Sequence, residues 1–386
     1  MPRPVSRAAR LGGLALVAVV GLAAGGRRAE SYPQYQLSRD QTCTACHLSP
    51  AGGGLLNENG YNAADVGSQF STAPEFMYGK LPTPSWLALG GDLRAAAGDI
   101  HTPQNAVTVF PMQADLYVHA SYAGISLQLT GGLRPAQWIT RNGTPAVLDR
   151  FWSREHYLMW QQDDGGSSGL YVRAGRFMPV FGLRLVEHVD YVRRHGGTPL
   201  YGETYAAAVE YVTPSWEAHA TGFVADPLID AVVQDSGFAG YAEVRLNERL
   251  AVGGEGMVAV TGGQATVRGG ATAKLYLPSA ELLLEGELQV AHQQVSGGGA
   301  PNQVIGYVLA SRALTGALLL DVGLGHYDEN VAISGLDRDA VDLNLHWFVT
   351  SHLELVWQSR IEGIGIGASR GGPTSGWSLL HAHYRL

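Results

Sequence analysis

The sequence has very few cysteines and lysines and, after its first residues, no long apolar run. Its 386 residues include two cysteines, Cys43 and Cys46, and two lysines, Lys80 and Lys274. Both cysteines lie in one short motif, so none remains for a disulfide elsewhere. After Ala24 no stretch has the roughly 20 apolar residues that a membrane-spanning helix needs. The formal net charge of −8 and the lack of basic patches argue against nucleic acid as a partner.

The two cysteines belong to the pentapeptide Cys43-Thr44-Ala45-Cys46-His47, which fits the attachment pattern of c-type haem. The two thiols can add to the two vinyl groups of haem, and the imidazole of His47 can reach the iron as proximal ligand. A zinc site is the alternative, but zinc needs a fourth ligand at a recognisable spacing. The sequence has no second CxxC and no HxxxH. We therefore expect one covalent haem c, bound by Cys43, Cys46 and His47.

The N-terminal residues have the pattern of a secretory signal peptide. Three arginines in the first ten residues precede the apolar run Leu11–Ala24, and small residues follow up to Ala29. An uncleaved membrane anchor is the alternative, but the run is shorter than the ~20 residues of a spanning helix. We expect residues 1–29 to be removed and the chain to be exported. Export suits the haem motif, because c-type attachment takes place outside the cytoplasm in bacteria.

The remaining chain divides in two. Residues 30–84 are rich in turn signals, such as the Ser49–Gly54 stretch, Asn59-Gly60 and Pro82-Thr83-Pro84. A segment this short and this poor in aliphatic residues cannot bury much core alone. We expect it to be a monohaem cytochrome c segment whose core is supplied by the haem itself or by packing against another part of the protein.

Residues 85–386 consist of segments of about ten residues in which apolar and polar side chains alternate. Val341–Trp347 is the clearest example, with apolar odd and polar even positions. Such alternation places the two kinds of side chain on opposite faces of a strand. We count sixteen candidate strands, which start near Trp86, Val107, Gly124, Trp152, Leu170, Tyr201, Trp216, Ala239, Leu250, Ala265, Ala280, Gln303, Gly316, Ala340, His352 and Trp377.

The alternation predicts an all-β fold, an antiparallel outer-membrane β-barrel of about sixteen strands with the short haem segment as a plug. A secreted β-sandwich is the alternative, but it would bury one face in a core. The candidate inward face carries Asp, Glu, His, Asn and Gln in strand after strand. Because unpaired charges are costly to bury, we expect this face to meet water.

A haem motif directly after a signal peptide, followed by a barrel over residues 85–386, resembles the fused monohaem cytochrome–porins. These are outer-membrane proteins of iron-oxidising and other electron-exchanging bacteria. Pro33 and Tyr35 match that family's Pro and aromatic residue ten and eight positions before the first Cys, whereas Leu37 stands where the family has Arg. The resemblance implies electron transfer, as in an outer-membrane iron oxidase. Its partners would be an extracellular donor or acceptor, for example Fe(II), and periplasmic carriers such as small cytochromes.

The sixth ligand of the haem iron is open at this point. Met77 is the only methionine between His47 and the first candidate strand, and an axial Met would raise the reduction potential. Lys80 and an open sixth position are alternatives. A second His would have to come from candidate inward-facing positions of the barrel, namely His119, His219, His346, His381 and His383.

A dense group of charged residues follows the motif Gly175–Gly182, which itself resembles a strand-end motif of anion- and sugar-selective porins. The group contains Arg184, Glu187, His188, Asp190, Arg193, Arg194 and His195. It could form a constriction, gather a metal or bind a partner. A solvated loop with surface salt bridges is the plainest interpretation, because exposed ion pairs are worth little and are common.

Three functions fit the sequence. The first is electron transfer across the outer membrane through the haem, which lies on the periplasmic side or within the barrel lumen. The alternative is a solute-selective porin whose haem segment is a plug or docking handle. A haem enzyme or sensor with an open iron position is the third. The sequence has no nucleophile elbow, phosphate loop or metal-hydrolase motif.

Overall fold

The computed structural model describes residues 42–72, 75–100, 107–133, 151–225, 235–294, 300–364 and 375–386. The predicted signal peptide over residues 1–29 lies outside these ranges, as do Pro33 and Tyr35. Among the described residues, no helix combines the length and the apolar character that a bilayer crossing requires.

Sixteen strands and four short helices make up the regular structure of the described residues. The helices are Cys43–Cys46 (α2), Glu58–Val66 (α3), Phe76–Gly79 (η2) and Val192–Gly196 (η5). The strands are Leu87–Ile100 (β1), Val107–Tyr122 (β2), Ile125–Leu133 (β3), Phe151–Gln161 (β4), Gly169–Phe177 (β5), Thr204–Val212 (β6), Trp216–Val224 (β7), Ser236–Asn247 (β8), Leu250–Thr261 (β9), Gln264–Leu277 (β10), Leu282–Gln293 (β11), Asn302–Thr315 (β12), Leu318–Asp328 (β13), Asp337–Phe348 (β14), Leu353–Glu362 (β15) and Ser375–Arg385 (β16).

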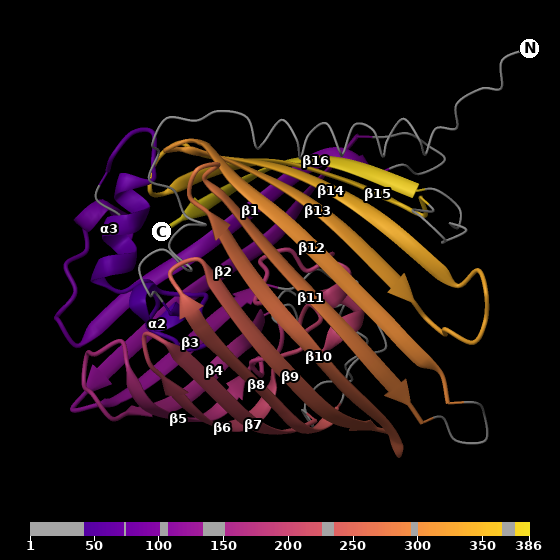
Figure 1. The fold of residues 1–386 in the computed structure, drawn as a ribbon. Coiled ribbons are helices and arrows are strands. Elements are labelled where there is room, and N and C mark those ends of the chain that lie inside the picture. Colours follow the sequence, from indigo (N-terminus) through magenta and orange to yellow (C-terminus); the bar gives the residue numbers. More distant parts are fainter. Residues whose placement is uncertain are drawn as a thin grey trace, which may run out of the picture.

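The strands form one closed antiparallel barrel (Figure 1). Each strand pairs with its neighbours along the chain, and β1 pairs with β16 from Asp92 opposite Arg385 to Ile100 opposite Trp377. The prediction of a closed barrel of about sixteen strands is therefore confirmed. The predicted and observed strand starts agree closely, with the largest shifts at β6, β8 and β14, which begin at Thr204, Ser236 and Asp337.

Alternation along each strand separates an apolar outer face from a polar inner face. Leu116, Leu288 and Leu380 are 57%, 56% and 58% exposed on the outside. On the inside, Glu210 and Glu217 are 0% and 1% exposed. At these two positions the inner face is buried, whereas the sequence predicted that it meets water. These carboxylates are buried because arginines from other elements pair with them, so burial does not leave them uncompensated.

Strand β2 departs from simple alternation at Met112, because alternation with Ala114 and Leu116 would place this side chain on the outer face. The register between β1 and β2 shifts here, because Arg94 pairs with Gln113 and Ala95 pairs with Pro111. Met112 is thus the extra residue of a β-bulge, next to a proline that cannot donate a ladder hydrogen bond. As a result, Met112 and Gln113 both line a cavity inside the barrel.

The two ends of the barrel differ. Short turns close one end, such as residues 123–124, 248–249 and 316–317. At the other end, residues 178–203 connect β5 to β6, and we call this connection the inward loop. Residues 42–72, which we call the N-terminal segment, lie at the short-turn end, where the chain also terminates (Figure 1).

Hydrogen bonds fasten the N-terminal segment to this end of the barrel. The backbone N–H groups of Gln69 and Phe70 donate to the carbonyls of Phe348 and Val349, at 2.9 and 3.0 Å. The indole Nε1 of Trp347 donates to Gln69 Oε1 at 2.6 Å. The segment is therefore held at the turn between β14 and β15.

Candidate functional site

The haem motif forms a single helical turn, α2. The backbone N–H of His47 donates to the carbonyl of Cys43 at 2.8 Å, which closes the turn. A turn of helix brings residues three positions apart to neighbouring places on its surface, so the Cys43 and Cys46 side chains lie near each other. Both are free thiols in the structure.

The start of helix α3 holds α2 in place. The side-chain amides of Asn57 and Asn59 donate to the carbonyls of Thr44 and Ala45, each at 2.9 Å. Gly60 lies so close to the motif that a Cβ there would come within 2.2 Å of the Cys46 carbonyl oxygen. Glycine is required at this position, because any side chain would push the two helices apart.

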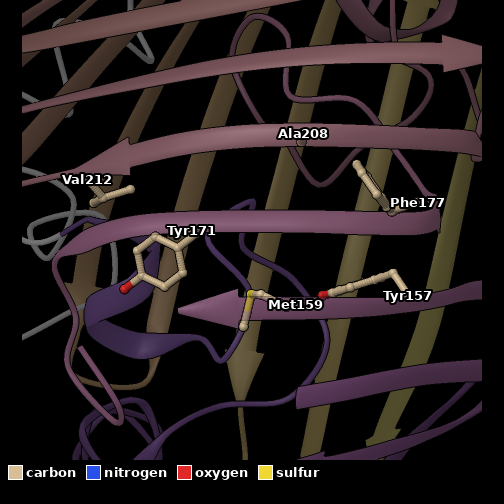
Figure 2. Close-up of a cluster of buried hydrophobic side chains, with 6 residues drawn as sticks. All are labelled: Tyr157, Met159, Tyr171, Phe177, Ala208 and Val212. Atoms are coloured by element: carbon tan, nitrogen blue, oxygen red, sulfur yellow. The ribbon is translucent and has the colours of Figure 1, made fainter. Parts of the chain in front are cut away.

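Helix α2 packs against the inner face of β4 and β5. Thr44 Oγ1 donates to the carbonyl of Ser167, in the turn between these strands, at 2.5 Å. The hydroxyl of Tyr157 lies near Ser49 and that of Tyr171 near Thr44. The Tyr171 hydroxyl donates to the carbonyl of Gly166 at 3.2 Å. Figure 2 shows these two tyrosines with Met159 beside the N-terminal segment. The motif is thus lodged in the mouth of the lumen at the short-turn end.

The motif side chains fit c-type haem. Burial lowers the pKa of His47 to about 4, although its hydrogen bond to the Gly53 carbonyl acts in the opposite direction. The imidazole is therefore neutral at physiological pH, which is the form that binds iron. Among the described residues, Nδ1 of His47 is buried without a hydrogen-bond partner. Two free thiols followed by a neutral imidazole with an uncommitted nitrogen are the donor set of the haem c attachment motif.

The structure places Met77 and Lys80 away from the lumen. Met77 is 45% exposed and has a left-handed backbone with φ of 52°, and Lys80 is also exposed. The neighbouring ring of Tyr78 packs on His352 with ring centroids 4.1 Å apart, so this part of the chain lies at the barrel rim. No contact among the described residues brings Met77 to the motif, and its role as an iron ligand stays a prediction.

The five histidines proposed from the barrel all lie on its inner face, but four are engaged by neighbours. His119 contacts Gln128, His219 contacts Glu210, His346 contacts Glu354, and His383 contacts Asp92. Within the described part of the chain, the remaining histidine, His381, is 5% exposed and has both ring nitrogens without hydrogen-bond partners.

The inward loop folds into the lumen, so the interpretation of residues 184–195 as a solvated loop is wrong. Phe181, Asp190 and Tyr191 are 2%, 3% and 0% exposed. The apolar residues among the charged ones drive this burial, because leaving them in water would cost free energy. Within the described ranges, no group of three His, Cys, Asp or Glu residues could hold a metal ion.

Arg184 connects the inward loop to both the barrel wall and the N-terminal segment. Its guanidinium donates to Glu217 on β7 and to the carbonyl of Pro50 at 3.4 Å. It also lies over the ring of Tyr241, 5.5 Å from the centroid. A single side chain thus bridges the three parts of the protein that meet beside the haem motif.

An ionic network on the inner wall was not foreseen from the sequence. Arg173 donates to Glu210 through two nitrogens at 2.9 and 2.6 Å. Arg245 lies 3.0 Å from Glu243, which also pairs with Lys274 at 2.9 Å. Alternation places these residues on the inner face, but their pairing depends on the strand register, which the sequence does not reveal.

Comparisons with known proteins show the fold. No protein-family model and no curated protein matches the sequence. Among solved structures, OmpT of Vibrio cholerae is 13% identical with a TM-score of 0.57, over 80% of this chain and 100% of that one. An anion-selective porin from Comamonas acidovorans is 13% identical with a TM-score of 0.55, over 78% and 99%. OmpF of Salmonella typhi is 6% identical with a TM-score of 0.58, over 78% and 97%.

These three structures share the barrel fold of outer-membrane porins, and this chain has that fold. The match covers most of this chain and nearly all of each porin. The resemblance to fused cytochrome–porins is not tested by these comparisons and stays a prediction.

Proposed function

We propose that this chain is an outer-membrane channel of the porin type whose N-terminal segment carries one covalent haem c and acts as a plug. The barrel spans the outer membrane, with its apolar outer face against lipid. Barrels of this class have short turns on the periplasmic side, so the haem segment faces the periplasm.

The observation that carries this proposal is a closed barrel that retains a cavity inside it. The cavity has a volume of about 270 Å³ and extends from Gly54 in the N-terminal segment to Leu200 in the inward loop. The inward loop narrows the lumen from one side and the N-terminal segment from the other. The space left between them would suit small solutes and exclude large ones.

Cys43, Cys46 and His47 would hold the haem, which supplies a one-electron redox centre when bound. The contacts of Thr44, Asn57 and Asn59 keep the motif helix in a fixed orientation. Close packing on Tyr157 and Tyr171 limits the access of water to the motif. These contacts favour a plug over a freely moving docking handle.

Conductance in planar bilayers tests the channel. The haem-loaded full chain should produce stepwise currents, smaller than those of an unobstructed barrel of sixteen strands, because two segments occupy the lumen. A boiled sample is the control. A native sample that produces no steps beyond this control would contradict the channel.

Electron transfer is the second candidate function. It is favoured by the position of Cys43, whose thiol is partly buried beside the charges of Arg184 and Glu217 inside the barrel. A redox centre within the barrel is nearer to both sides of the membrane than one outside. In this case an extracellular donor or acceptor, such as Fe(II), would exchange electrons with small periplasmic cytochromes.

Intact cells can test this candidate. A chelated Fe(II) complex too large to permeate should reduce the haem, and His47→Ala should abolish that reduction. If only small permeant reductants reduce the haem, the electron-transfer function is contradicted and the channel with a haem-bearing plug is retained.

A further inference from the structure

The cavity inside the barrel lies between the wall formed by β1–β4 and the inward loop. Six Asp, Arg and His residues contribute to its lining, namely Asp92, Arg94, Asp115, Arg154, His188 and Arg193. The way these residues are paired determines which charge the cavity can accept.

Both carboxylates of the lining are already engaged. Asp92 lies 2.7 Å from the Nε2 atom of His383 and accepts a hydrogen bond from the Tyr117 hydroxyl at 2.5 Å. Asp115 accepts from Arg154 at 2.8 Å and from Gln113 at 2.6 Å. Their negative charge is thus largely offset, and a cation entering the cavity would have to compete with these donors.

Two of the three arginines are also engaged. Arg154 is shared between Asp115 and Glu203, at 2.8 and 3.0 Å. Arg193 donates to the carbonyls of Leu185, Val186 and Thr198 at 2.8, 3.2 and 3.3 Å. These hydrogen bonds fix the position of Arg193 at the cavity but leave its charge without a bound carboxylate.

Arg94 is different, because its guanidinium has no hydrogen bond and no ion pair within the described part of the chain. Its Nε atom is buried and lacks a partner. Glu187 of the inward loop lies in the same neighbourhood, where both it and Arg94 act on His188, but the two form no ion pair. A partly buried cation without a partner is unfavourable, so an anion in the cavity would gain a strong contact.

The rest of the lining is largely apolar and aromatic. It includes Met112, Leu133, Leu200 and the rings of Trp152 and Tyr201, whose centroids are 5.8 Å apart. A purely inorganic anion would make no apolar contact with these side chains. An anion with an apolar body would satisfy both parts of the lining.

We propose that this cavity binds a small organic carboxylate and that Arg94 is its charged contact. A guanidinium can donate two parallel hydrogen bonds to a carboxylate, and the aromatic wall receives the organic part. The inference rests on the proposed channel function and names the class of solute that the channel would select.

Calorimetric titration of the haem-loaded full chain in detergent tests the site, with benzoate as the probe. Benzamide is the matched neutral compound, and it should bind far more weakly. Arg94→Gln should weaken benzoate binding by about tenfold or more, the loss expected for one charged hydrogen-bonded contact. Since Arg94 has no partner to leave unpaired, this variant should fold normally and retain its heat-dependent gel shift.

Arg249→Gln is the control, because Arg249 is exposed in the turn between β8 and β9, and it should bind benzoate like the wild type. Equal binding of benzoate and benzamide, or unchanged binding in Arg94→Gln, would overturn the proposal. Conductance of the same samples separates the two claims. Currents without benzoate binding refute the solute class alone, whereas benzoate binding without currents supports the site and refutes the channel.

Discussion

At the residue scale, the inner wall of the barrel depends on charges that are buried in pairs. Arg173 and Glu210 are 1% and 0% exposed, and the guanidinium lies over the ring of Phe177, 4.2 Å from its centroid. Such a pair adds little net stability by itself, because both charges lose water. Its importance is that neither partner can be removed alone.

Glu210→Ala should therefore destabilise the barrel strongly. It would leave Arg173 buried without its hydrogen-bonded carboxylate, at a cost of about 3–5 kcal/mol. Urea unfolding of the protein in detergent, followed by tryptophan fluorescence, measures this loss. Glu329→Gln is the control, because its pair with Arg338 is 3.6 Å long and exposed, and it should cost less than about 1 kcal/mol. Equal midpoints for the two variants would contradict the account.

His195 should make the inward loop sensitive to acid. Burial, followed by the charge of Arg194, lowers its pKa to about 4, from an unperturbed value of about 6.5. Its ring stacks on Tyr327 with centroids 4.0 Å apart. As the pH falls from 6.5 towards 4, the unfolded loop takes up a proton that the folded loop does not, so folding is weakened.

Amide hydrogen exchange of residues 190–196 should show this effect as faster local opening at pH 5 than at pH 7, after correction for the intrinsic rate. His195→Phe should remove most of the difference, because it keeps a ring at the stacking position and cannot titrate. Replacement of the exposed His292 should leave the difference between pH 5 and pH 7 unchanged. A loop equally protected at both pH values would count against this role of His195.

At the scale of single elements, the alternation of apolar and polar residues located the strands well, because each strand has one lipid-type face and one lumen-type face. It failed where the backbone broke the period, as at Met112, where the bulge beside Pro111 adds one residue. The alternation also could not show that the inward loop folds into the lumen. The burial of Asp190 in this loop depends on Arg360 from β15, which lies 3.7 Å away and is distant in sequence.

The candidate site was predictable only in its local part, the motif itself, and not in its position within the barrel. The spacing of Cys43, Cys46 and His47 predicts a haem attachment motif, because the chemistry of attachment is local in the chain, and the presence of haem there stays a prediction. The contacts of Arg184 with Glu217 and with Pro50 were not predictable, because they join residues distant in sequence. Such contacts decide where the motif lies in the barrel.

Arg184→Met should loosen the N-terminal segment. The variant loses the hydrogen bond to the Pro50 carbonyl and the pair with Glu217, whereas Glu217 keeps Arg245 at 3.4 Å. Limited proteolysis of the detergent-solubilised protein should then cut residues 42–72 several times faster than in the wild type, while the barrel stays intact.

Arg194→Met is the matched control for this experiment. Arg194 belongs to the same loop, but its side chain is 52% exposed and its ion pair with Glu362 is 3.4 Å long. Cleavage rates that are the same in both variants and in the wild type would show that Arg184 does not hold the segment.

At the scale of the whole molecule, the protein is a closed barrel with a loop entering from one end and a motif-bearing segment seated at the other. The inward loop and the N-terminal segment meet at Arg184 and leave a cavity along the β1–β4 wall. This arrangement would place covalent haem inside a barrel rather than in a separate domain. One polypeptide would then be both an outer-membrane barrel and a c-type cytochrome.

A denaturing gel of boiled and unboiled protein, stained for haem peroxidase activity, tests whether one polypeptide has both properties. The protein should come from a strain that matures c-type cytochromes. Haem stain is expected in both lanes, at different mobilities, because the folded barrel migrates anomalously and the covalent haem survives boiling. Cys46→Ala should weaken the stain and leave the shift unchanged. An unstained wild-type band, or a stained band that does not shift on boiling, would contradict the account.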